Sequence, residues 1–259
     1  MSHPVEILLP HNLKELNLSM MVKNYPSHAR QARESGLSYE EFLLSLTEAE
    51  LQTRAENRLK RRVREAHFPL MKTLEGFTYE AAPELDRRLI RDLISGEYIR
   101  ERKNVILMGK SGTGKTHLAI GLGIEACRQG LSTRFVSGSA LANELIESRD
   151  EKKLSRVVQR YRQYSLLIID ELGYIPFSRQ GAELLFQVLA ERHERGSVII
   201  TTNLGFSDWT QVFGDPTLTA ALLDRLTHKA HIITCSWESY RFKESLKHRQ
   251  QNGSSKKED

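Results

Sequence analysis

Several features that define other classes of protein are missing from this chain of 259 residues. No apolar run approaches the roughly 18 residues that a membrane-spanning helix needs, and the N-terminus lacks the basic-then-apolar pattern of a secretion signal. The two cysteines, Cys127 and Cys235, lie far apart and form no metal-binding or redox motif. We therefore expect a cytoplasmic protein with reduced thiols and no membrane partner.

What the chain does contain is charge of both signs. Charged residues make up 27% of the sequence, the net charge is +5, and hydrophobic residues make up 39%. This apolar content is enough for a core. The basic balance permits nucleic-acid binding without proving it.

Residues 1–68 contain no convincing strand and predict a small all-helical N-terminal domain. One short helix is expected to carry four apolar residues on one face: Leu13, Leu16, Met20 and Met21. Pro26 is expected to begin a second helix that Gly36 ends. Ser38 and Glu41 form the capping-box pattern at the start of a long helix, which Pro69 stops.

Further along the chain, apolar runs alternate with helical patterns. Five strands are expected, at residues 104–108, 132–136, 165–170, 197–201 and 230–234. Runs such as 166–169 and 198–200 are apolar throughout, which is typical of strands buried on both faces of a parallel sheet. Residues 69–249 are therefore predicted to form a doubly wound α/β domain that binds ligand at the carboxyl ends of its strands. Residues 250–259 are expected to be a disordered polar tail.

One segment is a complete phosphate-binding loop of the pattern G-x-x-x-x-G-K-[ST]: Gly109, Lys110, Ser111, Gly112, Thr113, Gly114, Lys115 and Thr116. It lies between an apolar run and a helical pattern that starts at His117. Glycines let backbone N–H groups point at phosphate oxygens, and the next helix adds its positive N-terminal end. Lys115 is expected to reach the β- and γ-phosphates of ATP, and the Thr116 hydroxyl to ligate Mg²⁺.

Two of the apolar runs end in polar residues that suit the same chemistry. Asp170 and Glu171 follow residues 166–169, so Asp170 is a candidate Mg²⁺ ligand and Glu171 a candidate base for the attacking water. The alternative is a strand followed by a solvated acidic turn. Asn203 follows residues 197–202 and is a candidate for orienting that water or contacting the γ-phosphate, although Asn is also common in ordinary turns.

The order of these motifs, followed by a helix-borne Arg225, resembles the AAA+ ATPases. Within that class the chain is similar to bacterial replication initiators and DnaC-type helicase loaders, and above all to the IstB-type helper ATPases of insertion-sequence transposons. Phe77 and the segments 81–86, 114–119 and 223–228 carry the resemblance to the IstB type, and the segment 236–241 resembles the loader clade. It implies an AAA+ P-loop core with a five-stranded parallel sheet, preceded by the helical N-terminal domain.

The same resemblance implies roles for further residues. Residues 109–117, His117 included, would bind the nucleotide. Arg225 falls where the family has an arginine finger that acts on the nucleotide of the neighbouring subunit, and Arg241 falls where the clade has its sensor-2 arginine. The chain after the last strand lacks a full helical lid, as in the loader and helper clade.

The function implied by the resemblance is an Mg²⁺-dependent ATPase that oligomerises on duplex DNA, with ATP sites at subunit interfaces, and recruits or activates a cognate transposase. The alternative is a DnaC-like helicase loader in DNA replication, which would use the same ATPase chemistry. A metabolic P-loop kinase is disfavoured because the chain shows no acceptor-substrate motif.

Two basic runs are candidate DNA contacts. Six basic residues crowd the end of the long N-terminal helix, and Arg58, Arg61 and Arg62 are the candidates there. Cations at a helix C-terminus also complement the helix dipole, but that explains one or two charges rather than six. In the second run, at residues 149–162, the candidates are Lys152, Lys153 and Arg156, and a solvated amphipathic helix is an equal alternative.

Overall fold

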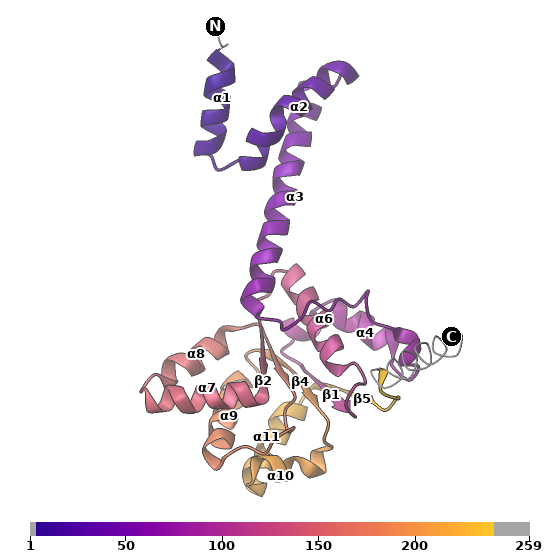
Figure 1. Cartoon of the computed structure of the whole chain (residues 1–259), viewed down its shortest axis with the longest axis vertical. Coiled ribbons are helices and arrows are strands. Elements are labelled where there is room, and N and C mark those ends of the chain that lie inside the picture. Colours follow the sequence, from indigo (N-terminus) through magenta and orange to yellow (C-terminus); the bar gives the residue numbers. More distant parts are fainter. Residues whose placement is uncertain (1–3, 241–259) are drawn as a thin grey trace, which may run out of the picture. The chain divides into compact units, whose positions relative to one another are not determined.

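The computed structural model describes residues 4–240. The chain divides into two compact units, Met1–Arg61 and Arg62–Asp259. Each unit is described by itself below, with the element labels of Figure 1. Among the described residues, no helix combines the length and apolar character needed to span a bilayer.

The first unit contains α1 (Pro4–Glu15), α2 (Ser19–Ser35) and most of α3 (Tyr39–Ala66). The predicted capping box is present, because the Ser38 N–H donates to Glu41 Oε2 at 2.7 Å and the Glu41 N–H donates to Ser38 Oγ at 3.2 Å. Gly36 ends α2 in the left-handed conformation, with φ of 65°. The capping box and the helix end at Gly36 are thus set by local sequence.

The predicted start of the second helix is wrong. Leu13 and Met21 do not share one helix, because α1 ends at Glu15 and Asn17 turns the chain with φ of 57°. Pro26 lies inside α2, which has already begun at Ser19. The reason is a distant cap: a Glu50 carboxylate oxygen accepts hydrogen bonds from the N–H groups of Met20 and Met21 at 2.8 and 3.2 Å.

The second unit is built on one parallel sheet of five strands in the order β2-β3-β4-β1-β5. The strands are β1 (Asn104–Gly109), β2 (Thr133–Ser137), β3 (Leu166–Asp170), β4 (Ser197–Thr202) and β5 (Ala230–Cys235). All five predicted strands are present within one residue of their expected bounds, and the predicted α/β fold with a parallel sheet is confirmed.

Helices cover both faces of this sheet (Figure 1). One face carries α4 (Arg87–Ile94), α5 (Glu97–Arg100) and α6 (Lys115–Arg128). The other carries α7 (Gly138–Asp150), α8 (Leu154–Gln163), α9 (Arg179–Arg192), α10 (Trp209–Phe213) and α11 (Pro216–Thr227). Single 3₁₀ turns lie at Tyr79–Ala81 and Phe206–Asp208.

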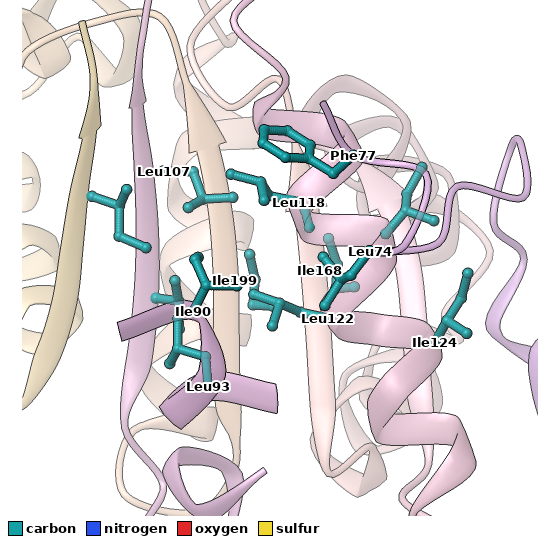
Figure 2. Close-up of a cluster of buried hydrophobic side chains, with 14 of the residues drawn as sticks. Leu74, Phe77, Ile90, Leu93, Leu107, Leu118, Leu122, Ile124, Ile168 and Ile199 are labelled. Atoms are coloured by element: carbon teal, nitrogen blue, oxygen red, sulfur yellow. The ribbon is translucent and has the colours of Figure 1, made fainter. Parts of the chain in front are cut away.

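Alternation along the strands divides the core between the two faces. Leu107, Ile168 and Ile199 point to the α6 side, where Figure 2 shows them near Leu118 and Leu122. Their strand neighbours belong to the core of the opposite face. Because both faces are covered, the central strands β3 and β4 are buried along their whole length, and their runs 166–169 and 198–200 are apolar throughout, as the sequence indicated.

The sheet brings the ends of β3, β4 and β1 together at its carboxyl edge. In the register of the sheet, Leu107 pairs with Thr201, and Ile169 pairs with Ile200. Asp170 therefore ends β3 beside Thr201, and the loop after Gly109 starts on the other side of β4. This edge carries the candidate site.

Candidate active site

The phosphate-binding loop connects the end of β1 to the start of α6. Gly112 and Gly114 adopt φ of 81° and 89°, a region that favours glycine. A side chain at Gly112 would also collide with the Ser239 hydroxyl, and one at Gly114 would lie 2.8 Å from the Phe77 ring. Both backbone shape and close packing therefore require glycine at these positions.

The Lys115 side chain folds back over the loop. Its Nζ donates hydrogen bonds to the backbone carbonyls of Gly109 and Lys110 at 2.6 and 2.7 Å. Burial raises the pKa of the neighbouring Cys235 thiol to about 11, against the opposing effect of the Lys115 ammonium. Cys235 is therefore a protonated, uncharged thiol at neutral pH.

Four residues from three parts of the chain meet behind the loop. Thr116 Oγ1 donates to the Asp170 carboxylate at 3.0 Å, and Thr201 Oγ1 donates to the same carboxylate at 2.5 Å. The Thr201 oxygen also accepts from the Glu171 N–H at 2.9 Å. Asp170 is buried, while Glu171 is exposed and adopts φ of 55°. The Thr201 hydroxyl on β4 thus contacts both Asp170, the last residue of β3, and Glu171, which follows it.

A cavity of about 410 Å³ opens in front of this cluster. Of the predicted site residues, 111–117, Glu171 and Asn203 line it. Gly109 and Lys110 form the base of the loop, and Asp170 lies behind Thr116. His117 contacts the segment before β1 as well, since its Nε2 lies 2.8 Å from the Thr73 carbonyl oxygen and its ring meets the Phe77 ring edge-on.

Oxygen ligands for a hard cation are present in this cluster. The Thr116 hydroxyl and both Asp170 carboxylate oxygens lie together at the start of α6, next to the phosphate loop. Mg²⁺ prefers such oxygen ligands and commonly keeps water in its remaining positions. The residues present therefore fit an Mg²⁺ ion bound alongside phosphate.

The sequence did not predict the residues that support the site through hydrogen bonds. Thr201 is one, because its importance follows only from the β3–β4 pairing. The segment after β5 supplies two more. Trp237 Nε1 donates to the Thr113 carbonyl at 2.9 Å, and the Tyr240 N–H donates to the Gly112 carbonyl at 3.0 Å. The only signal for them in the sequence was their place in a segment that resembles the loader clade.

Arg225 does not line this cavity. It lies in the last turn of α11, where its guanidinium donates to the Ala221 carbonyl at 2.7 Å and lies 5.1 Å from the centre of the Phe186 ring. Its expected role toward a neighbouring subunit stays a prediction. Arg241 lies outside the described residues.

The candidate DNA contacts fall into separate places. Arg58 and Arg61 are exposed on α3 in the first unit, and Arg62, half-buried, belongs to the second. Lys152, Lys153 and Arg156 are exposed around a shallow cleft at the start of α8. Lys153 also pairs with Glu151 at 2.9 Å. These roles too remain predictions.

The fold and the loop define a P-loop nucleotide-binding protein of the AAA+ class. Solved structures with this fold include DnaI (18% identity, TM-score 0.54, covering 68% of this chain and 93% of that one) and the replication initiator DnaA bound to AMPPCP and single-stranded DNA (19%, TM-score 0.52, 68% and 55%). At these identities they show the fold alone.

Sequence relatives identify the family. Residues 11–248 match the family of IstB-like ATP binding proteins. The chain is 39% identical to the insertion sequence IS21 putative ATP-binding protein of Pseudomonas aeruginosa, over 95% of this chain and 91% of that protein. It is 36% identical to the IS5376 counterpart of Geobacillus stearothermophilus, over 88% and 91%. The chain therefore belongs to the IS21-type, IstB-like ATP-binding protein family, as its resemblance implied.

Proposed function

We propose that this protein is an Mg²⁺-dependent ATPase that oligomerises on duplex DNA in the cytoplasm and recruits or activates a transposase. The observation that carries the ATPase part is the hydrogen-bonded group of Thr116, Asp170, Thr201 and Glu171 at the wall of the 410 Å³ cavity. The family and the names of its members, which are proteins of insertion sequences, support the transposition part.

In the proposed reaction each group has a separate task. The loop N–H groups and the Lys115 ammonium hold the phosphates. Thr116 and Asp170 would hold Mg²⁺, which neutralises charge on the phosphate oxygens when bound. Glu171, at the exposed edge of the cavity, accepts a proton from the attacking water, and Asn203 on the adjacent strand end orients that water.

Two substitutions separate binding from hydrolysis. Lys115→Ala should abolish ATP binding, whereas Glu171→Gln should bind ATP and lose about 10²–10⁴ in turnover, the usual contribution of a general base. Glu147→Gln, on the exposed face of α7, is the matched control and should behave as the wild type. Near-normal turnover by Glu171→Gln would show that another group activates the water.

The proposed oligomer places Arg225 in the ATP site of a neighbour. Arg225→Ala should keep nucleotide binding while losing hydrolysis and ATP-driven assembly, because arginine fingers contribute about 10³–10⁵ in rate where they have been measured. Mixing Arg225→Ala with Lys115→Ala protein should restore part of the activity, because some interfaces then pair both intact residues. Proven co-assembly without recovery would contradict a shared site.

DNA binding is tested by salt dependence. Alanine at Arg58, Arg61 and Arg62 should weaken duplex binding and lower the slope of log affinity against log salt by about 0.9 for each DNA phosphate that is no longer neutralised. Alanine at Lys152, Lys153 and Arg156 tests the second run in the same way. A control triple on the surface of α4 and α5, at Arg88, Arg91 and Arg100, should leave the slope unchanged.

The transposase partner is tested directly. The proposal predicts that the protein, with ATP and DNA, stimulates strand transfer by the transposase encoded in the same insertion sequence. Stimulated loading of a replicative helicase, with no effect on strand transfer, would favour the helicase-loader alternative instead.

A further inference from the structure

A second, smaller cavity lies at the opposite edge of the sheet from the phosphate loop. It has a volume of about 210 Å³ and adjoins Asn104, the first residue of β1. Its walls also come from the turns that follow α9 and α11. Nothing in the proposed ATPase mechanism uses it.

Four metal-ligating side chains line this cavity, and three of them lie close together: His193, Glu194 and His228. The fourth, Glu101, pairs with Lys103 at 2.6 Å. One ligand atom from each lies within 4.8 Å of the other two, and the two imidazole rings are 5.7 Å apart between centroids. Two imidazoles and one carboxylate make up a ligand set found in zinc sites, which leave the fourth position to water. Ligands on one tetrahedral zinc lie roughly 3.3 Å apart, so closure requires movements of about 1–1.5 Å.

The backbone around the cavity favours a cation. His193 and His228 directly follow the last residues of α9 and α11, so two helix C-termini, with their partial negative charge, meet at this place. The residues after the two histidines, Glu194 and Lys229, turn the chain with φ of 57° and 55°. Both histidines therefore occupy the same position in the same kind of helix end.

One of these helix ends is firmly anchored. The buried Arg192 guanidinium, next to His193, donates to the carbonyls of Tyr164 and Ser197 at 2.9 and 2.8 Å. The anchor holds the His193 backbone against the sheet, while Glu194 and His228 are exposed and can adjust. Ligands that are already held in place lose less conformational freedom on binding, and the anchored His193 backbone supplies one such ligand.

The cations already present compete only weakly. Lys229 Nζ lies 3.6 Å from a Glu194 carboxylate oxygen, but both side chains are more than half exposed, and such pairs contribute about 0–1 kcal/mol. The Arg102 guanidinium donates to the Glu194 backbone carbonyl at 2.8 Å rather than to its carboxylate. A dication that also gains two imidazole ligands would therefore have to displace only this weakly held Lys229 ammonium.

We propose that His193, Glu194 and His228 form a transition-metal site that takes Zn²⁺, with water as the fourth ligand. The ion would link the ends of α9 and α11. Because the last turn of α11 carries Arg225, which rests on Phe186 of α9, the metal would also hold the proposed interface arginine in position. The proposal stands apart from the proposed ATPase function, since no nucleotide takes part in it.

The test is a calorimetric titration of Zn²⁺ alone into the full chain, without affinity tag or nucleotide, in a non-chelating buffer. One saturable site per chain is expected. His193→Asn and His228→Asn should each weaken it more than about 100-fold, since even residues beyond the ligands themselves commonly affect metal affinity 10–100-fold. The matched control is His11→Asn, an exposed histidine of α1, which should leave the affinity unchanged.

Two further variants test the third ligand and its competitor. Glu194→Gln should weaken Zn²⁺ binding, and Lys229→Gln should retain or tighten it, by up to about fivefold. Zn²⁺ should also raise the melting temperature of the wild type and of Lys229→Gln, but not of the two histidine variants. The proposal is overturned if both histidine variants bind Zn²⁺ as the wild type does, or if the wild type shows no saturable site.

Discussion

The two units of the chain are held together in different ways. In the second unit, strands such as β3 are buried along their whole length between two layers of helices. Within residues 4–61 only three side chains are buried, Met21, Leu46 and Glu50, and one of them is a carboxylate. Many apolar side chains of this unit are exposed: Val5, Ile7, Leu8, Leu9, Leu16, Leu37, Tyr39, Leu43, Leu44 and Leu51.

This difference shows where each unit obtains its stability. The second unit, named the ATPase unit for its proposed function, relies on apolar burial, which involves no titratable group. The helical unit relies on local caps and on one network of charged hydrogen bonds around Glu50. A unit of the second kind opens at lower cost and is more readily reshaped when a partner binds.

The largest effect should come from the core of the ATPase unit. Ile168→Ala removes a fully buried side chain at the centre of the sheet and should lower the free energy of unfolding by about 2–5 kcal/mol. Leu43→Ala, at an exposed position of α3, should change it by less than about 0.5 kcal/mol. Urea denaturation of both variants gives the comparison, and equal losses would contradict it.

The second-largest effect should come from removal of the Glu50 carboxylate. Burial alone would raise the pKa of Glu50, but hydrogen bonds from Arg54, Met21 and Met20 outweigh it and hold the pKa below its usual value. Glu50→Gln should cost the helical unit about 1.5–3 kcal/mol, the range for hydrogen bonds to charged groups. Limited proteolysis should then cut first within residues 4–61.

The same carboxylate gives the helical unit a pH dependence. Because the pKa of Glu50 is lower in the folded state, its stabilisation is complete above the unfolded pKa, near 4.5, and is lost as the pH falls through the folded value. Circular dichroism between pH 6 and pH 3 should show this loss in the wild type but not in Glu50→Gln. An identical acid response in both would assign the effect to other carboxylates.

In the ATPase unit, the Thr201 side chain makes a comparable set of hydrogen bonds. Thr201→Val keeps the shape but removes the donor to Asp170 and the acceptor for the Glu171 N–H. If the lost hydrogen bonds raise the activation free energy by about 1.4–2.8 kcal/mol, kcat should fall 10- to 100-fold. Thr201→Ser should restore most of it, and KM for ATP should change less than kcat. A change confined to KM would contradict a positioning role.

The smallest of these effects concerns the local cap. Ser38→Ala removes one side of the capping box and should destabilise the helical unit by about 1 kcal/mol. Ser27→Ala, an exposed serine of α2 in the same unit, serves as the control with little expected loss. The thermal unfolding midpoint of the helical unit measures both.

The same contrast explains what could be predicted from the sequence. The strands, the phosphate loop and the capping box at Ser38 depend on residues within a few positions of each other, so their patterns were visible. The start of α2 depends on Glu50, about thirty positions away, and no local pattern reveals it. Thr201 required knowledge of which strands are neighbours. The proposed roles of Arg225 and of the basic runs involve other molecules, which a pattern within one chain does not describe.

The contacts of Trp237 and Tyr240 with the phosphate loop have a consequence for nucleotide affinity. A peptide unit that turns its N–H toward one side presents its carbonyl to the other, and the segment after β5 binds those outward carbonyls at Gly112 and Thr113. These hydrogen bonds hold the loop in one conformation, in which its other side is available to phosphate. Less conformational entropy remains to be lost on binding, so part of the affinity for nucleotide resides in a segment beyond the last strand.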